Sequence, residues 1–191
     1  MATTNSLFHH DGISLTISCG DPATTTFLAT HLEQHVRSDL EMPIILLVDV
    51  PHGFALRTSE CEDLSSKLWI VTTLNRCSDY NELLWEYGIQ SLVSYDMLFD
   101  VLPKVLVNVS RGERCRYLTN HVPLLTPAER RTLRLLGDGL SNEHMADRLG
   151  TSVYCVKNSV KSVLSKLPVQ NRSQAGLYFW GMLEPQEMTN R

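Results

Sequence analysis

The chain has 191 residues, of which 43% are hydrophobic and 20% are charged, so it has enough apolar material for one large packed core or two modest ones. No apolar run approaches the roughly 20 residues that cross a bilayer, and the opening MATTNSLFHHDG has neither the basic start nor the apolar stretch of a signal peptide, so we expect a cytoplasmic protein. The net charge of −4 divides into −7 over residues 1–120 (8 Lys/Arg, 15 Asp/Glu) and +3 over residues 121–191 (9 Lys/Arg, 6 Asp/Glu), which suits only the C-terminal part to meet a polyanion.

Strand-like and helix-like segments alternate in the N-terminal part. We expect a strand at 13–18 (ISLTIS), then a helix with Asp21 as N-cap and Pro22 at its first position. The apolar run 44–50 (IILLVDV) is typical of a strand that is covered on both faces, and Asp49 lies near its end. Further elements are expected at 68–72 (strand), 80–87 (helix), 91–94 (strand) and 97–109 (helix). This alternation predicts an α/β domain over residues 1–112, a parallel sheet with flanking helices.

Short helices are predicted throughout the C-terminal part. Periodicity is lost at 113–123 (ERCRYLTNHVP), which we interpret as a linker to a domain at 124–191. The TPAE segment at 126–129 has a capping hydroxyl, a proline at the first helical position and a glutamate at the third, which is a capping box. Later helices are expected at 141–149, at 152–167 and after Asn171, which with Gln174 repeats the box. This pattern predicts an all-α, four-helix domain.

The third of these helices is amphipathic and has a basic outer face. Its apolar stripe consists of Val153, Val156, Val160, Val163, Leu164 and Leu167. Lys157 and Lys161 are one turn apart and can reach phosphates or guanine edges, while Asn158 can pair with an adenine edge. A solvated helix face is the alternative, and periodicity alone does not decide between the two.

The whole segment LTPAERRTLRLLGDGLSNEHMADRLGTSVYCVKNSVKSVLSKLPVQNRSQAGLYFWG resembles the LuxR-type helix-turn-helix domain without a gap. LTPAE, the GLSN turn, A-x-RLG, VKNSV and NRSQA all stand where that family has them. The resemblance implies that 141–149 supports a recognition helix, 152–167, in the DNA major groove. It also implies base or phosphate contacts for the recognition helix and a backbone contact for the start of the last helix. The predicted DNA-binding residues are Tyr154, Lys157, Asn158, Lys161, Ser162 and Arg172.

The segment departs from the family pattern in several places. His144 stands where a glutamate is usual, which would remove a carboxylate cap, and Cys155 and Ser159 replace a common threonine and histidine. The last two changes fall on phosphate contacts, so we expect weaker affinity and an intact fold. The last helix carries more apolar groups than a lone helix exposes, which indicates core packing together with a dimer contact. These groups are Leu177, Tyr178, Phe179, Trp180 and Leu183.

The N-terminal part resembles a shortened, degenerate receiver domain of the NarL/FixJ class of response regulators. ELLWEYGIQSLVSYD is similar to the fourth helix and fifth strand of a receiver, and VSRGER to the end of its last helix. The resemblance places Asp49 at the phosphoacceptor position and Thr72 at the hydroxyl that senses the phosphoryl group. Phosphoryl transfer to a carboxylate also needs a divalent ion held by acids, and a lysine. Here Cys19, Gly20 and Tyr95 stand at those positions, so we expect Asp49 to be a vestigial phosphoacceptor.

The spacing supports the same interpretation, because only 30 residues separate Cys19 from Asp49. We therefore expect part of the second strand and helix of a receiver to be deleted or remodelled. No metal ligand set is evident around His31 and His35. The five cysteines are odd in number and form no C-x-x-C pair, which argues against a disulfide framework.

The sequence thus predicts a bacterial DNA-binding transcription regulator that is not an enzyme and acts as a dimer at promoters, independently of phosphorylation. Its expected partners are double-stranded promoter DNA, a second copy or a related regulator, and RNA polymerase; we expect no cofactor, no metal and no membrane contact. Two alternatives stay open. One is an accessory regulator that heterodimerises with a complete response regulator, and the other is a phosphorylation-switched regulator that uses Asp49.

Overall fold

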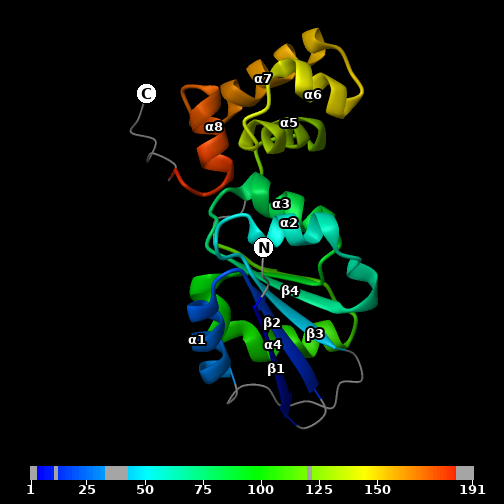
Figure 1. Ribbon diagram of the computed structural model, residues 1–191, viewed down its shortest axis with the longest axis vertical. Helices are drawn as coiled ribbons and strands as arrows, with labels where there is room; N and C mark the ends of the chain where they lie inside the picture. Colours follow the sequence, from blue (N-terminus) through cyan, green and yellow to red (C-terminus); the bar gives the residue numbers. More distant parts are fainter. Residues whose placement is uncertain (1–3, 11–12, 33–42, 120–121, 184–191) are drawn as a thin grey trace. The chain divides into compact units, whose positions relative to one another are not determined.

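The computed structural model describes residues 4–10, 13–32, 43–119 and 122–183, and the chain divides into two compact units (Figure 1). The first unit comprises Met1–Asn75 and Leu84–Thr119, and the second comprises Arg76–Leu83 and Asn120–Arg191. Among the described residues, no helix is both long enough and apolar enough to cross a membrane.

A six-stranded sheet with its strands in chain order forms the first unit. β1 (Thr4–His10) pairs antiparallel with β2 (Ile13–Cys19). The strands that follow are all parallel to β2: β3 (Ile44–Val48), β4 (Leu68–Thr73), β5 (Ser91–Ser94) and β6 (Cys115–Tyr117). The four predicted strands are confirmed within two residues at each end, and β3 stops just before Asp49.

Two strands were not predicted. β6 lies inside the segment that we interpreted as a linker, where Cys115 N donates to Gln90 O and the strand continues along β5. A three-residue strand has no periodicity of its own and forms because a neighbouring edge offers hydrogen-bond partners. β1 likewise forms by pairing along the whole length of β2.

The strand order differs from the flavodoxin-like order 2-1-3-4-5. Here β2 pairs directly with β3, and the edge beside β2 is held by β1, which precedes it in the chain and runs antiparallel. Helix α1 (Pro22–Leu32) is the one element described between β2 and β3, since residues 33–42 lie outside the described ranges.

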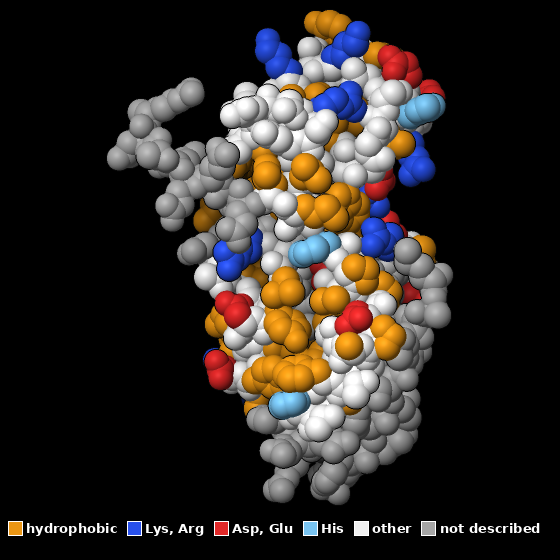
Figure 2. Space-filling model, turned by 60° about the vertical axis from the view of Figure 1, so that its left-hand side comes forward, with side chains coloured by type: hydrophobic (Ala, Val, Ile, Leu, Met, Phe, Trp, Pro, Cys, Tyr) orange, Lys and Arg blue, Asp and Glu red, His pale blue; other side chains and the backbone are white. Residues whose placement is uncertain are grey.

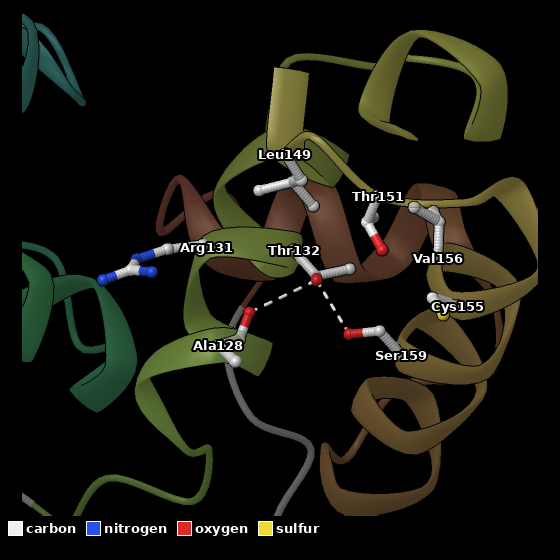
Figure 3. Close-up of a pocket in the computed structure, with 8 residues that line it drawn as sticks. All are labelled: Ala128, Arg131, Thr132, Leu149, Thr151, Cys155, Val156 and Ser159. Carbon is white, nitrogen blue, oxygen red and sulfur yellow. Dashed lines mark hydrogen bonds between the residues drawn. The ribbon is translucent and has the colours of Figure 1, made fainter. Parts of the chain in front are cut away.

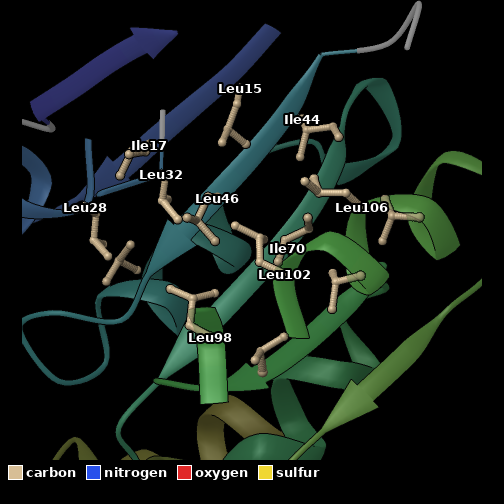
Figure 4. Packing of buried hydrophobic residues seen from close by; sticks show 14 of the residues in the cluster. Leu15, Ile17, Leu28, Leu32, Ile44, Leu46, Ile70, Leu98, Leu102 and Leu106 are labelled. Atoms are coloured by element: carbon tan, nitrogen blue, oxygen red, sulfur yellow. The ribbon is translucent and has the colours of Figure 1, made fainter. Parts of the chain in front are cut away.

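The main core of the first unit lies between one face of the sheet and helices α1 and α4 (Leu98–Ser110) (Figure 4). Leu28 of α1 and Leu102 of α4 are fully buried against alternate strand residues such as Leu46. Burying each such leucine stabilises the fold by about 1.5–3 kcal/mol. Phe27, the residue before Leu28 on α1, is 48% exposed.

Strand residues of the opposite parity, such as Leu47 and Val71, are also fully buried, so both faces of the sheet are covered. The helical elements between β3 and β5 are α2 (Phe54–Cys61), a 3-10 turn (Leu64–Ser66) and α3 (Ser78–Glu86). The sequence predicted α3 and α4 but not α2, which has only eight residues and no capping side chain.

Four helices form the body of the second unit. They are α5 (Pro127–Gly137), α6 (Asn142–Leu149), α7 (Val153–Lys166) and α8 (Arg172–Phe179). The N-caps Thr126, Ser141, Ser152 and Asn171 each accept a hydrogen bond from the backbone N–H three residues on, and the predicted capping box of α5 is complete. Gly150 ends α6 at φ 62°, a conformation that glycine adopts without strain.

Helices α5 and α8 approach closely because both have glycine at the contact. A Cβ on Gly176 would lie 3.0 Å from the Leu136 carbonyl oxygen, and one on Gly137 would lie 2.8 Å from the Phe179 ring. Trp180 Nε1 donates to Gly137 O at 2.7 Å. Phe179 is fully buried, so core packing accounts for part of the apolar surface of the last helix, while Leu177 stays 43% exposed.

Candidate nucleic-acid interface

The outer face of α7 carries a stripe of polar and aromatic side chains. Tyr154 is 73% exposed, and Lys157, Asn158 and Lys161 are exposed as well. Their spacing of three, four and seven residues from Tyr154 places them on one side of the helix. Val156, on the other side, is 1% exposed. The stripe therefore presents two ammonium groups, one amide and one phenol to solvent, anchored by a packed inner face.

The start of α7 is also open to solvent. Ser152 caps the helix by accepting from Cys155 N at 3.2 Å, and Thr151, Ser152 and Cys155 are exposed. Hydrogen bonds from Ser152, and then from Thr151, lower the pKa of the Cys155 thiol. Unpaired N–H groups and the positive end of the helix dipole make such a terminus favourable for a phosphate.

Glu129 ties α7 to α5. Its carboxylate accepts from Ser162 Oγ at 2.6 Å and from Lys166 Nζ at 2.7 Å, while it also completes the capping box with Thr126. Desolvation raises the pKa of Glu129, but the hydrogen bonds from Lys166, Ser162 and Thr126 outweigh it and lower the pKa to about 2. The sequence predicted this glutamate as a cap only, because its contact with residues 33 and 37 positions away depends on how the helices pack.

Two of the predicted DNA-binding residues make hydrogen bonds inside the unit. Ser162 is half-buried and donates to Glu129. Arg172 is also half-buried, and its Nη2 donates to Leu140 O, which joins the start of α8 to the turn between α5 and α6. Ser162 therefore ties α7 to α5, and Arg172 ties α8 to the turn between α5 and α6.

A hollow of about 230 Å³ lies between α5 and the first turns of α7 (Figure 3). Ser159 Oγ and Thr132 Oγ1 meet across it at 2.8 Å, and Thr132 Oγ1 also donates to Ala128 O at 3.3 Å. Cys155 lines the same hollow. The side chain of Ser159 therefore faces α5, whereas that of Cys155 is exposed.

The second predicted site, at Asp49, lies at the ends of β3 and β4. Asp49 is 1% exposed, and its Oδ1 accepts from Ala55 N while its Oδ2 accepts from Thr73 Oγ1, both at 2.9 Å. The expected hydroxyl was that of Thr72. That expectation was wrong by one residue, because Thr72 points to the opposite face of the sheet, next to Val48, and its backbone carbonyl accepts from Asp49 N. Successive side chains of a strand point to opposite faces of the sheet, so an error of one residue selects the wrong hydroxyl. The sequence alone did not define the end of β4 to one residue.

The surroundings of Asp49 do not fit a magnesium ion, which prefers oxygen ligands. Cys19 donates its thiol hydrogen to Val50 O at 3.4 Å, and Gly20 N donates to the same oxygen at 2.9 Å. A Cβ on Gly20 would lie 2.7 Å from Pro51 Cδ, so an acid has no room there.

Two other side chains stand near the positions that bind the metal ion and the phosphoryl group in a receiver, but both make contacts within the unit. Asp21 accepts from Thr24 N and Thr24 Oγ1 at 2.7 and 2.6 Å, and these bonds lower the pKa of Asp21. Tyr95, at the position expected for a lysine, packs against the core, and burial raises the pKa of its phenol. Within the described residues, no group of three or more His, Cys, Asp or Glu side chains could hold a metal ion.

Comparisons with known proteins relate the second unit to a protein family and most of the chain to bacterial regulators. Residues 123–179 match the family described as bacterial regulatory proteins, luxR family. The chain is 29% identical over 167 residues to the transcriptional regulatory protein LnrK of Bacillus subtilis (strain 168), which covers 75% of this chain and 73% of that protein. It is 25% identical over 138 residues to the transcriptional regulatory protein DesR of the same strain, covering 69% of each.

Solved structures give the fold of the whole chain. RcsB from Salmonella enterica serovar Typhimurium, bound to promoter rprA, matches with a TM-score of 0.50 and 18% identity over 91% of this chain and 100% of that one. A structure of two RcsB dimers bound to two parallel DNAs matches with a TM-score of 0.50 and 17% identity over the same shares. The fold is thus a receiver-like α/β domain followed by a helix-turn-helix domain. Residues 123–179 form a LuxR-type domain, and over most of its length the chain is similar to transcriptional regulatory proteins.

Proposed function

We propose that the chain regulates promoters by inserting α7 into the DNA major groove as a dimer, in the cytoplasm and without phosphorylation of Asp49. The observation that carries the proposal is the exposed stripe of Tyr154, Lys157, Asn158 and Lys161 on a helix whose start is open to solvent. A helix in the major groove contacts base edges with its outer side chains and phosphates with its flanks. RNA polymerase is the natural further partner of a promoter-bound regulator.

Each residue of the stripe suits a different contact. Lys157 and Lys161 can reach guanine edges or phosphates, and Asn158 can pair with an adenine edge. Tyr154 offers an apolar ring and a hydroxyl near the start of the helix. We assign Ser162 and Arg172 to positioning the helix, because their donors already serve Glu129 and Leu140 O. The DNA-binding domain would occupy 124–191, with the receiver-like domain at 1–112 and a connecting segment at 113–123 that contains β6.

The geometry of helix-turn-helix recognition supports the proposed dimer. One recognition helix covers only a few base pairs, so proteins of this type bind two half-sites about one helical turn apart, roughly 34–36 Å. RcsB, which shares the fold, is a dimer on DNA. We therefore expect this chain to protect a site with two related half-sites.

Independence from phosphorylation rests on the Asp49 geometry. Both carboxylate oxygens accept hydrogen bonds from within the unit, the side chain is 1% exposed, and Gly20 leaves no room for a second acid. A phosphoryl group would add about −1.5 to −2 charges at such a site. Asp49 instead joins β3 to α2 and β4, so we assign it a structural role.

Direct binding is tested with the full-length protein and a genome-wide DNA library, followed by anisotropy titrations of the recovered sites at several salt concentrations. Affinity should fall as salt rises, because each neutralised phosphate releases counterions. Lys157→Ala should weaken binding by about tenfold, whereas Arg111→Ala, which removes an exposed positive charge from the first unit, should leave it unchanged. Failure to recover any DNA at low salt would reject direct binding.

An accessory role in a heterodimer is the second candidate. The observation that favours it is that Ser159, at a position expected to contact phosphate, bonds to Thr132 instead, which removes one anchor from each copy. A complete response regulator as partner would supply the missing affinity. Footprinting of the pure protein decides between the two: protection of a symmetric site by a homodimer rejects an obligatory heterodimer, and protection only after a partner is added rejects the homodimer.

A further inference from the structure

Tyr154, near the start of α7, is the most exposed large hydrophobic side chain in the part of the chain that the structure describes, at 73%. Within those residues its ring contacts no other ring and its hydroxyl makes no hydrogen bond. The other five tyrosines are each buried, packed against the core of the first unit or hydrogen-bonded: they are Tyr80, Tyr178, Tyr95, Tyr117 and Tyr87. The fold therefore does not use the ring of Tyr154.

The first turn of α7, residues 153–156 (VYCV), carries no charged side chain and no amide side chain. The charged part of the exposed stripe begins only in the second turn, with Lys157. Val156 is 1% exposed, so the outward surface of the first turn consists mainly of Tyr154 and the smaller Cys155. On the part of the second unit that carries α6 and α7, Figure 2 shows Lys and Arg side chains next to hydrophobic ones. The start of α7 thus presents an uncharged aromatic ring beside a basic surface.

An aromatic ring at this end of the helix suits one kind of base. The recognition helix of a helix-turn-helix protein contacts base edges with its N-terminal residues, so Tyr154 is the first side chain of the stripe to meet the bases. The apolar group that a base presents in the major groove is the C5-methyl group of thymine, and the other edge groups are hydrogen-bond donors or acceptors. Covering that methyl group removes apolar surface of both partners from water.

We propose that Tyr154 is a specificity-determining residue that recognises a thymine in each half-site by covering its C5-methyl group with the phenol ring. The inference rests on the proposed function and deepens it, because it names a base that the bound DNA must contain. Four residues of an α-helix rise about 6 Å, and successive base pairs are about 3.4 Å apart. The thymine therefore lies within about two base pairs of the base that Asn158 contacts.

This contact has a salt response of its own. Binding through Lys157 and Lys161 should weaken as salt rises, because neutralised phosphates release counterions. The contact between the Tyr154 ring and a methyl group involves no charge. The ratio of the affinities for DNA with and without that methyl group should therefore be the same at every salt concentration, although both affinities fall.

The test uses the full-length protein and the DNA sites recovered from the genome-wide library. Each thymine of a site is replaced in turn by deoxyuridine, which lacks the C5-methyl group and keeps the hydrogen-bonding edge of thymine. At one position in each half-site, loss of the methyl group should weaken binding about threefold to fourfold. Replacement in both half-sites should weaken it by roughly tenfold to fifteenfold, because the two positions are independent. Fluorescence anisotropy measures these affinities.

Three variants assign the effect to the ring. Tyr154→Ala should bind the thymine and uracil sites equally, because the ring is gone, whereas Tyr154→Phe keeps the ring and should keep the discrimination. Tyr87→Ala is the matched control, since Tyr87 is a 38% exposed tyrosine of the first unit, and it should behave like the unaltered protein. Thermal unfolding followed by circular dichroism checks that each variant is folded.

Several results would overturn the proposal. These are equal affinities of the unaltered protein for thymine and uracil sites, or a discrimination that persists in Tyr154→Ala. A third is an equal loss of affinity of Tyr154→Phe for every DNA sequence, which would assign the hydroxyl to a phosphate. A protein that binds no DNA at low salt would reject the proposed function and the thymine contact with it, whereas a protein that binds DNA regardless of the methyl group rejects the thymine contact alone.

Discussion

The carboxylate of Asp49 and the outer face of α7 are both polar features that the sequence marks for function, yet packing treats them in opposite ways. Asp49 is 1% exposed, and hydrogen bonds from Ala55 N and Thr73 Oγ1 occupy its two oxygens. Lys157 and Lys161 are exposed on a helix whose other side is buried. A polar group is available to a ligand only when the fold leaves its hydrogen-bonding capacity open. The comparison therefore supports the two proposals, a structural role for Asp49 and a recognition role for α7.

Reversing the charge of the recognition face should give the largest effect. Lys157→Glu with Lys161→Glu replaces two attractions to phosphate or base by repulsions, so DNA affinity should fall about a hundredfold or more. The fold should be unaffected, because both side chains are exposed. Fluorescence anisotropy measures the affinity, and circular dichroism checks the helices. A double variant that binds normally would move the interface away from α7.

Removing the Asp49 carboxylate should cost stability rather than activity. Asp49→Ala leaves the Ala55 N–H and the Thr73 hydroxyl without their acceptor, which should lower the free energy of unfolding by about 2–4 kcal/mol. Asp49→Asn keeps one oxygen as an acceptor and should cost less than half of this. Urea unfolding gives the free energies, and a promoter reporter gives the activity. If the Asp49→Asn protein is stable but no longer regulates the promoter reporter, Asp49 has a functional rather than a structural role, and the proposed difference from α7 is wrong.

Glu129 should make the second unit sensitive to acid. Its pKa in the fold is about 2, below the value of about 4.3 for an exposed glutamate. The stabilisation is therefore fully present above about pH 4.3 and is lost as pH falls towards 2. Glu129→Gln should lose about 1–2 kcal/mol at neutral pH and remove that part of the acid response. Amide hydrogen exchange in α5 and α7 measures the loss of stability at neutral pH and its change with acid. Asp147→Asn is the control, because Asp147 is exposed.

The smallest effect is expected at Ser159. Ser159→Ala removes the hydrogen bond to Thr132 Oγ1, which should cost about 0.5–1.5 kcal/mol of stability. DNA affinity should stay within about threefold and the salt slope should not change, because the hydroxyl faces α5 rather than the groove. A change in the slope would place Ser159 at a phosphate and would make α7 a broader contact surface than its exposed stripe.

The second unit was predictable almost to the residue. Helix caps act within a single turn, so four adjacent residues are enough to place a helix end. In this unit they are the N-caps Thr126, Ser141, Ser152 and Asn171 and the C-terminal Gly150. The first unit was less predictable. β1 and β6 form by pairing with neighbours. The observed hydroxyl contact of Asp49, Thr73, lies one residue beyond the expected Thr72, because the end of β4 sets which side chain faces Asp49.

The sequence by itself determined the order and type of most elements, the helix caps and the basic character of α7, because these depend on periodicity and on contacts between residues close in the chain. Tertiary structure decided which of the polar residues remain available. Packing directs Ser162 and Arg172 into hydrogen bonds within the second unit. It also gives both carboxylate oxygens of Asp49 a donor, Ala55 N and Thr73 Oγ1, and leaves Phe27 exposed on α1. The physical reason is that a hydrogen bond between distant residues exists only once both elements are packed, and no local pattern specifies that partner.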